Sequence, residues 1–116
     1  MAVSDWDNFV AQTDQRMAAV RKGIPDVAKG FGALAKAATA PGTLDAKTKE
    51  LIALAIGITA RCDGCLAYHA RAAAGLGATR EEILEVIGVA VYMGGGPSMI
   101  YGAEALAAFD GLKQDG

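Results

Sequence analysis

The chain has 116 residues, which is enough for one domain with a buried core. Hydrophobic residues make up 53% of the sequence, above the roughly 45 to 50% typical of soluble domains, so we expect part of the apolar surplus to pack against other subunits. A formal charge of -2 provides no basic stripe for phosphates. We therefore expect neither nucleic acid nor a membrane surface as a partner.

The beginning of the chain carries Asp5 and Asp7 and lacks both a basic leader and a continuous apolar stretch. No secretion signal is expected, and a cytoplasmic location follows. The segment 86–103 is uncharged and has the length of a membrane span, but three glycines and a proline at 94–97 interrupt it. Two buried helices joined by a turn explain this segment better.

Helical periodicity runs through the whole chain, without strand-like alternation. The first predicted helix is capped by Ser4 and ends at Gly23, with an apolar stripe formed by Trp6, Phe9, Val10, Met17 and Val20. The second begins at Pro25 and stops at Pro41 and Gly42, with an apolar stripe formed by Val27, Phe31, Leu34 and Ala38.

The third predicted helix is capped by Asp45 and is apolar all round over 51–60, which predicts that it lies at the centre of the fold. The fourth begins near Cys62 and ends at Gly75 or Gly77.

Thr79 and Glu82 form a predicted capping box for the fifth helix, whose inward positions are Ile83, Val86, Ile87 and Ala90. Pro97 lies in the first turn of the sixth, which uses Met99, Ala103 and Leu106 for packing. Short connections favour an all-α, antiparallel helical bundle of about six helices. We expect one domain over 1–116, with its core motif region at 44–112.

Both cysteines and the only histidine lie within eight residues. On a helix, Cys62, Cys65 and His69 share one face, and the two cysteines can close a disulfide across the first turn. An unperturbed thiol with a pKa near 8.5 needs about 2 kcal/mol to reach 7, whereas a helix N-terminus contributes about 0.3 to 1 kcal/mol. A nearby base is therefore needed, and His69 is the candidate.

If the third and fourth helices fold back on each other around 60–63, Glu50 comes within about a turn of His69. Glu50 can then orient the imidazole, which takes the proton of Cys65 and later returns it to a departing alkoxide or thiol. In this interpretation Cys62 resolves the product as a disulfide.

One alternative is a metal site. The same four residues, Glu50, Cys62, Cys65 and His69, are conceivable as zinc ligands, although structural zinc usually takes four sulfur or nitrogen ligands. A metal-binding or purely structural helical module is therefore one alternative to an enzyme. Our leading hypothesis, thiol redox chemistry at Cys65 and Cys62, requires neither a metal nor a cofactor.

The stretch KTKELIALAIGITARCDGCLAYHARAAAGLGATREEILEVIGVAVYMGGGP resembles the AhpD-like branch of the carboxymuconolactone decarboxylase family. The resemblance implies an all-helical fold that assembles as trimers or hexamers. It also implies an oxidoreductase, a peroxiredoxin-type alkyl hydroperoxide reductase, whose cysteine pair is recharged by an external dithiol, possibly lipoyl-linked. A carboxymuconolactone decarboxylase-type lyase is the second alternative, although that branch generally lacks the cysteine pair.

Carried over residue by residue, the resemblance makes Cys65 the cysteine that attacks peroxide and Cys62 its more exposed resolving partner. It makes His69 and Glu50 the proton relay. The sequence therefore predicts a thiol-dependent peroxidase or disulfide reductase acting on a small hydroperoxide or disulfide.

Overall fold

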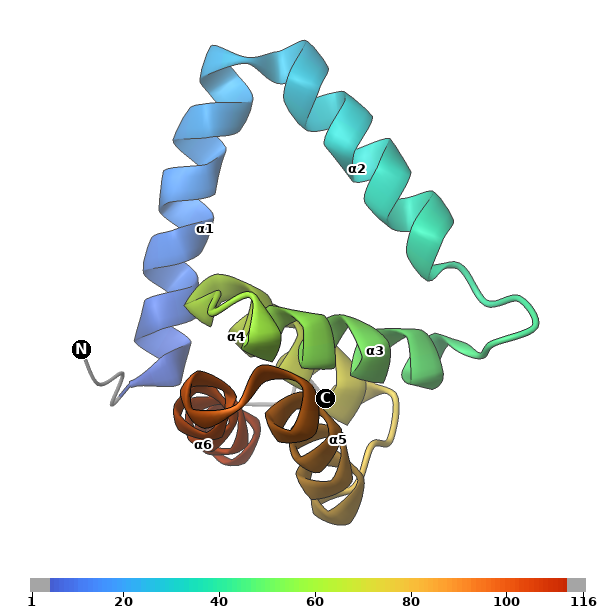
Figure 1. Ribbon diagram of the computed structural model, residues 1–116. Helices are drawn as coiled ribbons and strands as arrows, with labels where there is room; N and C mark the ends of the chain where they lie inside the picture. Colours follow the sequence, from blue (N-terminus) through green and yellow to red (C-terminus); the bar gives the residue numbers. More distant parts are fainter. Residues whose placement is uncertain (1–4, 113–116) are drawn as a thin grey trace.

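A computed structural model describes residues 5–112, and this part of the chain is helical without any strand, as the sequence predicts. The helices are α1 (Trp6–Gly23), α2 (Pro25–Thr39), α3 (Ala46–Thr59), α4 (Asp63–Gly75), α5 (Arg80–Gly94) and α6 (Gly96–Gly111). The last four pack together, while α1 and α2 form an open V that rises from them (Figure 1). We call α3–α6 the four-helix core and α1–α2 the arm.

The interior of the four-helix core combines large aliphatic side chains with alanines. Its largest fully buried hydrophobic side chains are Leu54, Ile58, Leu66 and Ile83. Between them α4 and α6 contribute alanines without solvent exposure: Ala67, Ala70, Ala73, Ala105 and Ala108. Because alanine lets helix backbones approach closely, α4 packs tightly against both α3 and α6. The predicted redox motif therefore lies at the start of a helix that packs against both α3 and α6.

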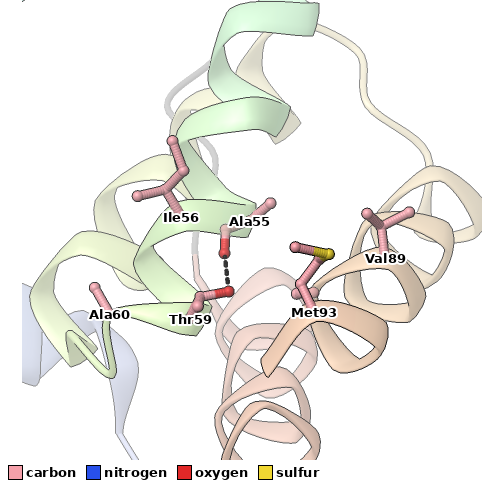
Figure 2. A pocket seen from close by; sticks show the side chains of 7 residues that line it. Ala55, Ile56, Thr59, Ala60, Val89 and Met93 are labelled. Carbon is pink, nitrogen blue, oxygen red and sulfur yellow. Dashed lines mark hydrogen bonds between the residues drawn. The ribbon is translucent and has the colours of Figure 1, made fainter. Parts of the chain in front are cut away.

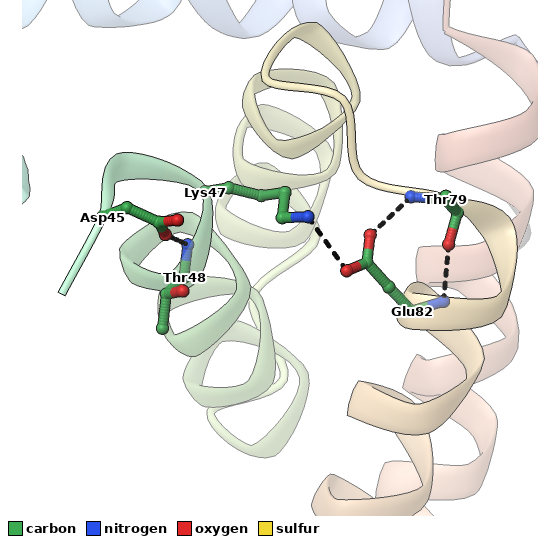
Figure 3. A network of polar contacts seen from close by, with 5 residues as sticks. All are labelled: Asp45, Lys47, Thr48, Thr79 and Glu82. Carbon is green, nitrogen blue, oxygen red and sulfur yellow. Dashed lines mark hydrogen bonds and ion pairs between the residues drawn. The ribbon is translucent and has the colours of Figure 1, made fainter.

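Side-chain caps fix the starts of two core helices, as predicted. Asp45 Oδ1 accepts a hydrogen bond from the Thr48 N–H at 2.8 Å, and the Thr79–Glu82 capping box is complete. Lys47 Nζ lies 3.0 Å from Glu82 Oε2, which joins the first turn of α3 to that of α5 (Figure 3). The backbone hydrogen bond from Thr79, with help from Lys47, lowers the pKa of Glu82.

The N-cap of the first helix lies one residue later in the chain than predicted. Ser4 lies outside the described residues, and the N-cap of α1 is Asp5, whose Oδ1 accepts from the Asn8 N–H at 3.0 Å. Pro25 opens α2 as predicted, because a residue without an N–H suits the first helical position.

Two predictions about apolar faces hold only in part. The third helix does lie at the centre of the fold, beside α4, α5 and α6, but its apolar surface is not all buried, since Ile52 and Ile56 are 45% and 63% exposed. In α6, Met99 is 61% exposed, and the helix packs instead through small residues such as Gly102, where an added Cβ would lie 2.6 Å from Ile87 Cγ2. Small residues allow close helix contact without contributing an apolar signal to the sequence pattern.

The second helix has the clearest apolar stripe and yet buries nothing. None of its residues is buried, and Val27, Phe31 and Leu34 are 65%, 66% and 64% exposed. Within the described residues α2 contacts α1 and the edge of α3, and it reaches none of the other core helices. Its stripe therefore faces solvent in the single chain.

The interruption at 94–97 ends one helix and begins the next, as predicted. Gly95 adopts φ 72° between α5 and α6, a left-handed conformation that glycine tolerates. Among residues 5–112, no helix combines the length and apolar character that a bilayer crossing requires.

Matching turns bracket α4. After α3, Arg61 adopts φ 59°, and the N–H groups of Arg61 and Cys62 donate to the Ile58 and Gly57 carbonyls. After α4, Gly77 adopts φ 89° with the same pair of bonds. These are Schellman turns, and the first holds a non-glycine residue in the left-handed region immediately before Cys62.

Candidate active site

The cysteine pair sits at the N-terminus of α4. Cys62 is the N-cap residue, and its Sγ accepts a hydrogen bond from the Cys65 N–H at 3.1 Å. The two side chains are joined as a disulfide, with Cα atoms 5.2 Å apart, and both residues are partly buried. The spacing argument for a disulfide across the first turn is thus realised in the structure.

The predicted partnership between Glu50 and His69 is also present. His69 Nδ1 lies 2.7 Å from Glu50 Oε1. The glutamate is 8% exposed, whereas a third of the histidine side chain reaches solvent. The hairpin between α3 and α4 sets this register, and the tight turn at Arg61 fixes where the hairpin reverses.

This geometry gives the imidazole a defined orientation. A carboxylate that accepts from Nδ1–H leaves Nε2 as the nitrogen that exchanges a proton elsewhere. Cys65 and His69 lie one helical turn apart on α4, on the same face. In the described part of the chain no hydrogen bond joins the imidazole to either sulfur, because a disulfide sulfur has no proton to share.

Gly57 of α3 brings the two helices of the hairpin together at the motif. A Cβ added at this position would lie 3.1 Å from Cys65 Cβ and 3.4 Å from the Leu66 nitrogen. The absence of a side chain thus lets α3 pack directly beneath Cys65.

The arm reaches the motif through α1. Thr13 Cγ2 would lie 3.9 Å from a Cβ at Gly64, and the Tyr68 hydroxyl donates to the Asp14 carboxylate. Burial, together with this carboxylate, raises the pKa of Tyr68 to about 12. The Arg71 guanidinium lies 5.5 Å from the centre of the Tyr68 ring.

The structure brings together two acidic residues that sequence reasoning missed. Asp63, which directly follows Cys62, lies close enough to Glu104 of α6 for the two carboxyl groups to interact. Burial and the Asp63 carboxyl raise the pKa of Glu104 to about 7. A charge at 104, inside the otherwise uncharged stretch 97–109, was the signal that could have marked it.

The zinc alternative gains no support from the geometry. Among residues 5–112 no group of three or more His, Cys, Asp and Glu side chains is arranged to hold a metal ion. The two sulfurs are instead bonded to each other.

Comparison with known proteins agrees with the helical fold. The model of the carboxymuconolactone decarboxylase family matches residues 25–108, which span all of α2 to α5 and most of α6. The chain belongs to the carboxymuconolactone decarboxylase family. An uncharacterised protein of Cupriavidus necator is 37% identical over 110 residues, which make up 95% of this chain and 97% of that relative.

Solved structures of carboxymuconolactone decarboxylase family proteins share the architecture. One from Legionella pneumophila, in its apo form, superimposes with a TM-score of 0.87 at 48% identity, over 90% of this chain and 94% of that one. One from Thermotoga maritima, for which involvement in an antioxidative response has been suggested, gives a TM-score of 0.78 at 33% identity, over 89% and 87% of the two chains.

Proposed function

We propose that this protein is a thiol-dependent peroxidase or disulfide reductase in which Cys65 attacks, Cys62 resolves, and His69 with Glu50 moves the proton. The observation that carries the proposal is the 2.7 Å contact between His69 Nδ1 and the buried Glu50, one turn along α4 from a bonded cysteine pair. Oriented base, nucleophile and resolving thiol are what a thiol redox cycle requires.

The chemistry proceeds in balanced steps. Cys65 as thiolate attacks the terminal oxygen of a hydroperoxide, so that an S–O bond forms, the O–O bond breaks, and the alkoxide takes the proton that His69 holds. Cys62 then attacks the sulfenic sulfur, which forms the disulfide and releases water. An external dithiol, such as a dihydrolipoyl group, reduces the disulfide and is itself oxidised. A reducing compartment such as the cytoplasm would supply such a donor.

The central test is the fate of the cysteines after one equivalent of an organic hydroperoxide. Mass spectrometry of the reduced protein should show the loss of two hydrogens. Cys62→Ser should instead stop at a sulfenic acid on Cys65, and Cys65→Ser should consume no peroxide. A Cys65→Ser protein as fast as the wild type would contradict the proposal. Turnover of a carboxylated lactone that survives alkylation of both cysteines would instead favour decarboxylase chemistry.

The relay has its own test in the pH dependence of Cys65 alkylation. His69→Ala should move the onset of reactivity toward the alkaline range, because the base that accepts the thiol proton is gone. Glu50→Gln should give a smaller change in the same direction, since the imidazole remains but loses its carboxylate partner. An alkylation profile identical in all three proteins would contradict the assigned roles.

We further propose a homo-oligomer, trimeric or hexameric, as the working form. Besides the exposed stripe on α2, the chain carries an apolar groove of about 370 Å³ between α3 and α5, where Ile56, Val89 and Met93 are 63%, 62% and 72% exposed (Figure 2). Two apolar faces on one chain can cover each other between copies, and a second copy is the occupant that we assign to them.

Sedimentation measures this assembly. We expect a mass well above a single 11.8 kDa chain and dissociation by Phe31→Asp, which places a charge on the α2 stripe. Lys29→Asp introduces the same side chain on the opposite side of α2 and is the matched control. A wild-type protein that sediments as one chain would rule out the oligomer.

A further inference from the structure

Two arginines from different helices gather around Tyr68, which lies one turn beyond Cys65 on α4. Arg71 is on the same helix, and its Cζ lies 5.5 Å from the centre of the Tyr68 ring. The Tyr68 hydroxyl donates to the Asp14 carboxylate of α1. Arg21 follows Asp14 by seven residues, so it lies on the same side of α1, about 10 Å further along the helix axis.

The two guanidinium groups have no carboxylate of their own. Within the described residues, neither Arg21 nor Arg71 forms an ion pair. Burial and the Asp14 carboxylate raise the pKa of Tyr68 to about 12, and the positive charges of Arg71 and Arg21 oppose this rise. Two cations around one carboxylate leave one positive charge uncompensated, on a chain whose formal charge is -2.

This charge balance favours a carboxylate as the ligand. A guanidinium group presents its N–H donors in a planar fork that matches the two oxygens of a carboxylate. One uncompensated positive charge matches a carboxylate better than a phosphate monoester, which carries a charge of about -2 at neutral pH. Arg21 is exposed and Arg71 is half-buried, so solvent molecules and small ligands can reach both.

The cysteine pair lies a short distance away along α4. Arg71 follows Cys65 by six residues, which corresponds to about 9 Å along the helix axis. The first helix passes beside the motif, where Thr13 Cγ2 would lie 3.9 Å from a Cβ at Gly64, between the two cysteines. A molecule held by its carboxylate at the arginines therefore needs a short alkyl chain to bring a thiol to the disulfide.

We propose that Arg71 and Arg21 bind the carboxylate of the dithiol that recharges the cysteine pair, so that the preferred donor is a small acidic dithiol. This inference rests on the proposed redox function. The structure holds Cys62 and Cys65 as a disulfide, which is the form that such a donor meets.

The arginines bind the donor and take no part in the bond changes. A thiolate of the donor attacks Cys62, a mixed disulfide forms, and Cys65 leaves with the electron pair and takes the proton of the His69 imidazolium. The donor's second thiol loses its proton to solvent and attacks its own sulfur in the mixed disulfide. The donor's disulfide closes, and Cys62 leaves with the electron pair and is protonated by solvent. The donor is oxidised by two electrons, and the cysteine pair is reduced by two.

The test compares dihydrolipoate with dihydrolipoamide, which carry the same dithiol and differ in a carboxylate against a neutral amide. Acid quench, alkylation and mass spectrometry give the second-order rate at which each reduces the protein disulfide at neutral pH. Each rate is divided by the rate with hydroxyethyl disulfide, which corrects for intrinsic reactivity. We expect a corrected preference for the acid of about threefold to tenfold at low salt, as charge pairs at a partly exposed site give. Added salt should reduce it.

Arg71→Gln and Arg21→Gln should each lower this preference, and the double variant should bring it to one or below, with the dihydrolipoamide rate unchanged. Arg16→Gln removes the same charge from an exposed position on the opposite side of α1. This matched control should keep the wild-type preference. Because Arg21 is exposed, its variant provides the test even if Arg71→Gln folds poorly. A merely structural role would slow both dithiols equally, and that result would overturn the inference, as would a wild-type preference of one.

Two outcomes separate this inference from the proposed function. If neither dithiol reduces the cysteine pair after treatment with peroxide, the proposed function and the inference are both wrong. If both dithiols reduce it at equal corrected rates in the wild type and in the arginine variants, the inference alone is overturned.

Discussion

The four-helix core and the arm use similar apolar patterns with opposite results. In the core, Leu54 and Ile58 at their helical spacing are completely enclosed, whereas Phe31 and Leu34 on α2 remain about two-thirds exposed. The difference lies in what stands opposite, because α3 has α4, α5 and α6 beside it and α2 has little more than α1. An apolar stripe thus identifies the helix face that favours burial, but it does not show which helix or which other chain buries it.

The largest effect should come from a matched pair of leucines. Leu54→Ala in the core should lower the free energy of unfolding by about 2 to 5 kcal/mol at any protein concentration, because it leaves a cavity. Leu34→Ala on the arm should cost less than about 0.5 kcal/mol in a single chain, and its effect should grow with concentration if α2 is covered by another copy. Urea unfolding at two concentrations distinguishes them. An equal loss for both in dilute protein would show that the arm is packed within its own chain.

A pair of glycines sharpens the comparison. Gly102→Ala should destabilise the protein by about 1 to 2 kcal/mol, because the new Cβ would press against Ile87. Gly32→Ala on α2 meets nothing within 4 Å and should stabilise by about 0.4 to 1 kcal/mol through reduced freedom of the unfolded chain. Thermal unfolding should therefore shift in opposite directions. Shifts of the same sign would contradict the difference in packing.

The turns on either side of α4 provide a smaller contrast within the core. Arg61→Gly should stabilise by about 0.5 to 1 kcal/mol, since it relieves a left-handed conformation. Gly77→Ala should cost about 1 kcal/mol, because the space around Gly77 is open and only its φ of 89° resists a side chain. Chemical denaturation of both variants measures the balance. An Arg61→Gly protein that is less stable would indicate that the arginine side chain has a role in the reduced or assembled protein.

The hydrogen bond between Tyr68 of the core and Asp14 of the arm should make the stability of the protein depend on pH in alkaline solution. The pKa of Tyr68 is raised to about 12 against about 10 in the unfolded chain. Its contribution to stability is therefore complete below pH 10 and is lost as pH rises through 12. The melting temperature of the wild type should fall more steeply over this range than that of Tyr68→Phe. Tyr92→Phe, at a position 85% exposed, is the control and should behave like the wild type.

Much of the site followed from local sequence. Helical spacing placed Cys62, Cys65 and His69 on one face, and the assumption of a tight hairpin placed Glu50 beside the imidazole. Both placements depend on positions a few residues apart or on a short hairpin, for which the regular geometry of a helix gives reliable relative positions. The Asp63–Glu104 contact joins residues on α4 and α6, and no local period relates positions so far apart in the chain.

The sequence by itself determined where the helices begin and end, because caps, prolines and glycines act within a turn of their own position. It also determined the spacing that places Cys62, Cys65 and His69 on one side of α4. Only the tertiary structure decided which apolar faces are buried, that Gly57 packs against Cys65, and that Glu104 of α6 comes close to Asp63. Those outcomes depend on how separate helices pack. Packing is decided by the side chains of both helices that meet, so the sequence of one segment does not specify it.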